Sequence, residues 1–186
     1  TEGAIQMVKK ILIISTSLRK DSNSEILAHE FEKGAKEAGN EVEFVSLKGK
    51  RIAFCNGCGM CQKTGRCNIR DDANAIVDKM ARSEVIVWAA PIYYYEMPGQ
   101  MKTLIDRANC LFCTENAIRE TYVLMTCSDE SQTAVDGPLK GVSGWVRCLQ
   151  GVELKGHVCA TSTTEPNTVL ESPAFMQAYN LGKSIE

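Results

Sequence analysis

Residues 10–31 read KILIISTSLRKDSNSEILAHEF, and this stretch decides the fold. It begins with the apolar run 10–14, which ends in the hydroxyl cluster 15–17. A short, continuous apolar run of this kind is typical of a strand buried on both faces of a sheet. Apolar side chains then recur at helical spacing from Leu27 to Ala38, and Gly39 follows as a stop signal. Ser22 and Glu25 stand at the spacing of a capping box at the start of this predicted helix.

The same alternation of strand and helix continues to the end of the chain. Strands are predicted at residues 41–47, 85–90, 122–127 and 156–161, and further helices are predicted to open at Asp71 or Asp72, Pro98, Pro138 and Pro173, with Phe112 on the apolar face of the Pro98 helix. The first, third and fourth strands are apolar throughout, which suits the centre of a sheet, whereas the other two are mixed and suit its edges. We therefore predict an α/β fold, a doubly wound five-stranded parallel sheet of flavodoxin-like order 2-1-3-4-5 with helices on both faces, and a single domain over residues 1–186.

Composition excludes several classes of protein. The net charge of −2 argues against a nucleic-acid binder that relies on phosphate neutralisation. The longest apolar stretch, residues 85–95, is broken by Pro91 and is far shorter than the ~20 residues that span a membrane, so no membrane partner is predicted. The first ten residues show no secretory pattern, and the nine cysteines are therefore expected to be reduced thiols in the cytoplasm.

The turn after the first strand is a predicted phosphate site. Ligands of such sheets bind at the carboxyl ends of the strands, near the point where strand order reverses. The turn carries five hydroxyls and leads directly into a helix N-terminus, which attracts anions. The residues expected to bind the cofactor here are Ser17, Arg19, Ser22, Asn23 and Ser24. The alternative is that these side chains only cap the helix.

The loop after the third strand is the second predicted wall of the site. It reads PIYYYEMP from Pro91 to Pro98, and three consecutive tyrosines cannot all point into a core. Aromatic faces and backbone amides suit a flat cofactor with polar edges, although a subunit interface would also explain them. The predicted cofactor residues are Pro91, Ile92, Tyr93, Tyr94, Tyr95 and Met97, with Cys127 and Ser128 as a third wall.

Four cysteines form the sharpest local motif. Cys55, Cys58, Cys61 and Cys67 follow the spacing C-x2-C-x2-C-x5-C. This compact spacing suits a [4Fe–4S] cluster better than zinc, whose two ligand pairs usually lie farther apart. The remaining cysteines are expected to be buried small residues, namely Cys110, Cys113, Cys127, Cys148 and Cys159.

Three of these stretches together resemble a known family. They are the S-x-R-x-x-S-N-S pattern of residues 17–24, the cysteine loop 54–72 and the segment PIYYYEMPGQMKTLIDR of residues 91–107. In this order they resemble the NAD(P)H-dependent FMN reductases of flavodoxin-like fold, which include multimeric-flavodoxin quinone reductases and iron–sulfur flavoproteins. The resemblance implies FMN with its phosphate on the 17–24 turn and its ring against residues 91–97. It also implies a homodimer or homotetramer.

The function implied by the resemblance is an oxidoreductase. NAD(P)H would reduce FMN, which would reduce a small acceptor such as a quinone, an azo or nitro compound, or free flavin. No side chain is predicted as a catalytic acid or base. The alternative is an iron–sulfur flavoprotein that carries electrons through FMN and a [4Fe–4S] cluster on the four loop cysteines. A third alternative, a flavin-free binding or regulatory domain, requires the 17–24 turn to be only a cap.

Overall fold

A computed structural model describes residues 8–186. The N-terminal stretch in which no secretory pattern is predicted lies mostly in residues 1–7, outside the described residues. The strands are β1 (Lys10–Ser15), β2 (Glu41–Ser46), β3 (Val85–Pro91), β4 (Glu120–Thr126) and β5 (Glu153–Ala160). The helices are α1 (Asn23–Glu37), α2 (Met60–Thr64), α3 (Asp72–Arg82), α4 (Gly99–Arg107), α5 (Asp136–Arg147) and α6 (Pro173–Lys183), with 3-10 turns η1 (Ala108–Phe112), η2 (Gln132–Val135) and η3 (Thr168–Glu171).

The sheet has the predicted order and direction. All five strands pair in parallel in the order β2-β1-β3-β4-β5, so the predicted flavodoxin-like topology is confirmed. β1, β3 and β4 are buried almost throughout, whereas the edge strands β2 and β5 are partly exposed. The continuous apolar runs and the mixed runs were thus correctly assigned to the centre and the edges.

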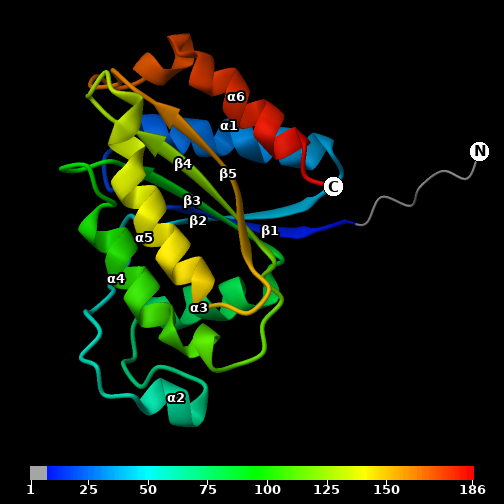
Figure 1. The fold of residues 1–186 in the computed structure, drawn as a ribbon, viewed down its shortest axis with the longest axis vertical. Coiled ribbons are helices and arrows are strands. Elements are labelled where there is room, and N and C mark those ends of the chain that lie inside the picture. The colour runs from blue at the N-terminus through cyan, green and yellow to red at the C-terminus, as the bar shows by residue number, and fades with distance from the viewer. Residues whose placement is uncertain (1–7) are drawn as a thin grey trace, which may run out of the picture.

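Helices cover both faces of the sheet, as predicted. Figure 1 shows α1 and α6 on one face and α3, α4 and α5 on the other. Each face has its own buried apolar cluster. α1 and α6 can approach closely because Gly34 and Gly182 have no side chain. A Cβ on Gly34 would lie 2.1 Å from the carbonyl oxygen of Tyr179, and a Cβ on Gly182 would lie equally close to that of Phe31. No helix of the described residues is both long enough and apolar enough to cross a membrane.

The capping box predicted at the start of α1 is wrong. Ser22 makes no side-chain cap hydrogen bond, and its Oγ lies 3.0 Å from the Oγ of Ser24. The carboxylate of Glu25 instead accepts hydrogen bonds from Ser15 Oγ and Lys48 Nζ, at 2.9 Å each. Contacts with the end of β1 and with the turn after β2 therefore prevail over the local cap, and the orphan amides of α1 stay available.

The helix predicted to open at Pro98 also differs. Pro98 is its N-cap, and the α-helix begins at Gly99 and ends at Arg107. The chain tightens into η1 beyond that residue, and Phe112 is exposed instead of continuing the apolar face. The physical reason is the fixed position of Arg107, whose guanidinium is held under the cysteine loop.

Candidate functional site

The β1–α1 turn presents donors at the carboxyl edge of the sheet. The side chains of Ser17, Ser22 and Ser24 are buried there. Within the described part of the chain, the backbone amides of Asn23 and Ser24 donate to no acceptor. Orphan amides of a first helical turn, together with the helix dipole, form a site for an anion such as a phosphate.

Two of the predicted turn residues make contacts within the protein. The side-chain Nδ2 of Asn23 donates to the carbonyls of Thr163 and Glu165, and its Oδ1 accepts from the backbone N–H of Val169. Arg19 Nη1 donates to the carbonyl of Thr164 at 2.9 Å. Both side chains therefore tie the turn to residues 163–169, a contact that the sequence did not reveal. Their role as cofactor ligands stays a prediction.

The three tyrosines form a tight, strained hairpin. The backbone groups of Tyr93 and Glu96 exchange two hydrogen bonds, at 3.0 and 3.1 Å. The two residues between them, Tyr94 and Tyr95, have φ values of 51° and 60°. Such turns usually take Asn and Gly, because left-handed backbone is unfavourable for bulky residues. Strain of this kind concentrates at functional sites, and Tyr94 is fully exposed at the tip.

A groove of about 510 Å³ lies between this hairpin and the loop after β4. It is lined by Ile92, Tyr93, Tyr94, Tyr95, Cys127, Ser128, Asp129 and Ala134, six of which are predicted site residues. Pro91 ends β3 beside it, and Met97 is buried behind the hairpin. Gln100 Nε2 donates to the carbonyl of Thr16 at 2.7 Å, which connects α4 to the β1–α1 turn. The fold thus brings the three predicted walls to one edge.

Tyr95 and Asp129 bridge the groove. The hydroxyl of Tyr95 donates to Asp129 Oδ2 at 2.6 Å. This hydrogen bond raises the pKa of Tyr95 and lowers the pKa of Asp129. The hydroxyl therefore stays protonated and the carboxylate ionised near neutral pH, so that the bridge persists there.

The cysteine loop encloses a second cavity. A cavity of about 760 Å³ lies between this loop, α4, η1 and α5, and all four predicted cluster ligands line it. No three His, Cys, Asp or Glu side chains of the described residues come together around one metal ion. A cube is less demanding, because each cysteine binds a different iron. The four thiols that line the cavity match the donor chemistry of a [4Fe–4S] cluster.

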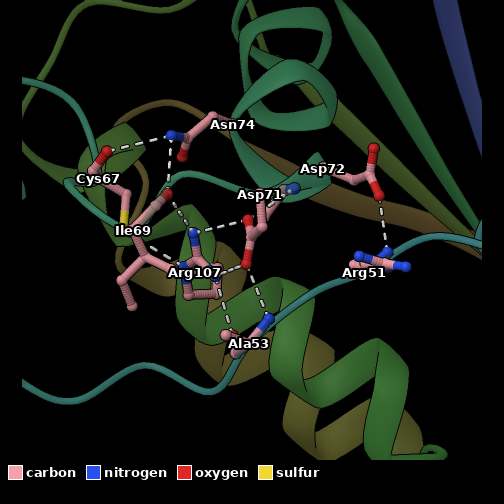
Figure 2. A network of polar contacts seen from close by, with 9 residues as sticks. Arg51, Ala53, Cys67, Ile69, Asp71, Asp72, Asn74 and Arg107 are labelled. Atoms are coloured by element: carbon pink, nitrogen blue, oxygen red, sulfur yellow. Dashed lines mark hydrogen bonds and ion pairs between the residues drawn. The ribbon is translucent and has the colours of Figure 1, made fainter.

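Arg107 fastens the cysteine loop to α4, as Figure 2 shows. Its fully buried guanidinium makes a bidentate ion pair with Asp71, at 2.6 and 2.9 Å. It also donates to the carbonyls of Ala53 and Ile69, and its Nε donates to the sulfur of Cys67 at 3.3 Å. Every N–H group of the guanidinium thus faces a partner in the loop.

Asp71 is the other half of this clamp. It caps α3 by accepting from the amide of Ala73, and it accepts from the amide of Ala53. Burial by itself raises the pKa of Asp71, but the hydrogen bonds from Arg107 and the two amides outweigh burial and lower it. From the sequence, Asp71 was predicted only as a possible helix start and Arg107 only as the end of the segment 91–107 that carries the family resemblance.

The family profile of NADPH-dependent FMN reductases matches residues 9–160, which include the turn, the cysteine loop and the groove. The chain belongs to this family. An iron–sulfur flavoprotein of Methanocaldococcus jannaschii is 37% identical over 102 residues, 55% of this chain and 53% of the relative. Bacillus subtilis YwqN, which is named an NAD(P)H-dependent FMN-containing oxidoreductase, is 24% identical over 183 residues, 94% of this chain and 97% of the relative. The chain thus spans about half the length of the first relative and nearly all of the second.

Solved structures share the flavodoxin-like fold of this FMN reductase family member. An NAD(P)H:quinone oxidoreductase from Methanothermobacter marburgensis superposes with a TM-score of 0.69 at 16% identity, covering 95% of this chain and 96% of that one. An FMN-dependent NADH-azoreductase from Bacillus anthracis, solved in complex with FMN, gives 0.67 at 17% identity, covering 93% and 97%. At these identities the likeness establishes the fold.

Two glycines of α5 differ in the space around them, so their alanine variants can be compared. A Cβ on Gly137 would lie 2.1 Å from the carbonyl oxygen of Tyr95, whereas one on Gly144 would meet nothing within 4 Å. Gly137→Ala should displace the tyrosine hairpin, lower stability by about 1–3 kcal/mol and weaken FMN binding. Gly144→Ala should add about 0.5–1 kcal/mol, because alanine suits a helix interior better. Thermal melts and FMN titrations of both variants test this, and equal effects would contradict the close approach.

The cysteines outside the loop are only partly as predicted. Cys110 and Cys127 are buried as expected, and Cys159 is half-buried. The predicted burial of Cys113 and Cys148 is wrong, because both are exposed. Cys113 comes directly after η1, and Cys148 comes directly after α5 and lines the second cavity. The thiols therefore differ in accessibility.

Alkylation at pH 8 should follow this difference. Burial raises the pKa of Cys110 and Cys127, and that of Cys159 to about 12, so little thiolate forms there. Iodoacetamide should modify the exposed cysteines first, as read by peptide mass spectrometry; these are Cys55, Cys58, Cys113 and Cys148. Reaction of Cys159 as fast as that of Cys55 would show that the thiol is not shielded.

Proposed function

We propose that this protein is an FMN-dependent NAD(P)H oxidoreductase that reduces a small acceptor such as a quinone, an azo or nitro compound, or free flavin. The observation that carries the proposal is the arrangement at the carboxyl edge of the sheet. Orphan amides of the β1–α1 turn and an aromatic groove of about 510 Å³ lie at neighbouring strand ends. This arrangement suits a phosphate and a flat ring of one mononucleotide.

The chain's own residues would position the cofactor. The amides of Asn23 and Ser24 and the hydroxyls of Ser17 and Ser24 would bind the phosphate, because they stand at the helix N-terminus. Ile92 and the tyrosine hairpin would lie against the ring, and the bridge from Tyr95 to Asp129 would hold the walls together. FMN, when bound, supplies the hydride and electron chemistry, so no catalytic acid or base is required of the protein.

The name of a relative, an exposed tyrosine and the free cysteines support the proposed activity, the oligomeric state and the compartment of the protein. A relative named as an FMN-containing oxidoreductase spans nearly the whole chain. The exposed tip of the hairpin, Tyr94, supports a homodimer or homotetramer whose contact lies near the flavin. All nine cysteines are free, which supports a reducing compartment such as the cytoplasm.

The activity is tested by mixing the FMN-loaded protein with NADH or NADPH and a panel of acceptors. We expect NAD(P)H oxidation that depends on a quinone, a nitro compound or an azo dye, with one nucleotide preferred. A protein that binds FMN but is not reduced by either nucleotide would overturn the proposal.

A second candidate function, an iron–sulfur flavoprotein, is favoured by the cysteine loop. Its four cysteines line one cavity, and two of their sulfurs accept hydrogen bonds from N–H donors. Several relatives are named iron–sulfur flavoproteins, with matches that cover about half of this chain. The cysteines named in the sequence, Cys55, Cys58, Cys61 and Cys67, would be the ligands of a [4Fe–4S] cluster.

Anaerobic purification separates the two candidates. With a cluster, the protein should contain about four irons per chain, and the Cys58→Ser/Cys61→Ser variant should lose them. Without a cluster, this variant should keep its FMN and its NAD(P)H turnover within a fewfold of the parent. We rank the small-molecule reductase first, because flavin reduction needs only the β1–α1 turn and the aromatic groove and does not need the cysteine loop.

A further inference from the structure

Two loop cysteines have N–H donors aimed at their sulfur atoms. Arg107 Nε donates to Cys67 Sγ, and Asn109 Nδ2 donates to Cys61 Sγ, both at 3.3 Å. The donors come from the end of α4 and from η1, whereas the sulfurs belong to the loop, 40 and 48 residues earlier in the chain. Two distant donors thus converge on the same group of thiols.

These contacts suit sulfur atoms that carry negative charge when they bind a metal. A neutral thiol is a weak acceptor, whereas a thiolate or a metal-bound sulfur accepts hydrogen bonds strongly. Arg107 is a permanent cation with a fully buried side chain, so its placement against a sulfur favours an anionic partner there. Asp71 satisfies part of that charge, and the Nε–H group faces only Cys67.

The other two cysteines are held differently. Cys58 Sγ donates to Asn68 Oδ1, and Cys55 Sγ accepts only from the nearby amide of Gly57. Both cysteines are exposed and are held from within the loop itself. The sulfurs of Cys61 and Cys67 are thus contacted from outside the loop, and those of Cys55 and Cys58 from within it.

We propose that Arg107 and Asn109 are positioning residues that orient Cys67 and Cys61 and stabilise the negative charge of an iron–sulfur group bound in this cavity. The proposal rests on the second candidate function. N–H groups directed at ligand sulfurs favour the reduced, more negative state of a cluster and so raise its reduction potential. Such outer partners also strengthen metal retention, typically by about 10- to 100-fold.

The test uses the full chain with FMN, reconstituted anaerobically with ferrous iron and sulfide. The variants are Asn109→Ala, whose parent side chain is exposed, and Arg107→Lys, which keeps the charge but loses the fork. The control is Lys36→Gln, because Lys36 is exposed on α1, on the other face of the sheet, and forms an i, i+4 pair with Glu32. Iron release to a chelator and the cluster potential from a spectroscopic redox titration are measured.

We expect both variants to release iron about tenfold faster than the parent and to titrate at a more negative potential, with the control unchanged. If the parent holds four irons and both variants match it in iron release and in potential, the N–H donors of Arg107 and Asn109 do not affect the cluster and the inference is wrong. If the parent holds no iron, the second candidate function and this inference fall together. NAD(P)H turnover of the same protein still tests the first function separately. Should Arg107→Lys fail to fold, Asn109→Ala decides the outcome alone.

Discussion

Arg107→Met is expected to cost about 3–5 kcal/mol of unfolding free energy, because it leaves the carboxylate of Asp71 without its buried partner. The guanidinium of Arg107 is wholly buried, and Asp71 is nearly so. The variant would also leave the carbonyl of Ala53 without its donor, and the carbonyl of Ile69 would keep only its hydrogen bond from Asn74 Nδ2. No apolar replacement can restore these contacts, so the cysteine loop should detach along with the start of α3.

Urea unfolding at pH 7 measures this effect. Lys102→Gln is the control, since it removes an exposed pair with Asp106 one helical turn away and should change stability by less than about 0.5 kcal/mol. Amide exchange should rise in residues 53–71 of the Arg107 variant and not in the sheet. A loss below about 1 kcal/mol would show that the clamp does not stabilise the loop.

Ser17→Ala/Ser24→Ala should weaken FMN binding by a few kcal/mol. Both hydroxyls are buried at the start of α1, and a hydrogen bond to a charged phosphate contributes about 1.5–3 kcal/mol. The dissociation constant, measured by quenching of flavin fluorescence, should therefore rise by about two to four orders of magnitude.

Asn23→Ala provides the contrast for this double variant. The parent side chain ties the turn to residues 163–169, so its loss should lower thermal stability more than it lowers FMN affinity. If the double serine variant instead binds FMN like the parent and melts earlier, those serines serve only the helix start.

The fold was predictable because its signals are local. Continuous apolar runs identified the central strands, and mixed runs identified the edges, so that both topology and layers followed. The capping box failed because Glu25 responds to Ser15 and Lys48, which only the folded sheet brings near it. The length of α4 failed similarly, because the contacts of Arg107 lie 36 to 54 residues earlier in the chain.

The site was predictable to the extent that it follows the strand ends. The 17–24 turn and the tyrosine loop lie where the parallel topology requires ligand-binding loops to lie. Residues 163–169 were missed because hydroxyls, Pro and Asn after an edge strand look like an ordinary loop. Their contacts with Asn23 exist only in the tertiary structure. The clamp of Asp71 and Arg107 was missed for the same reason.

The central claim is that one FMN binds at the carboxyl edge of this sheet, and the flavin content of the purified protein tests it most directly. The protein is loaded with excess FMN, freed of unbound cofactor and denatured, and the released flavin is identified by chromatography. The account predicts a yellow protein that releases about one FMN per chain, and no FAD, because the turn offers one helix N-terminus for one phosphate group. A colourless protein that also fails to quench added FMN would contradict it.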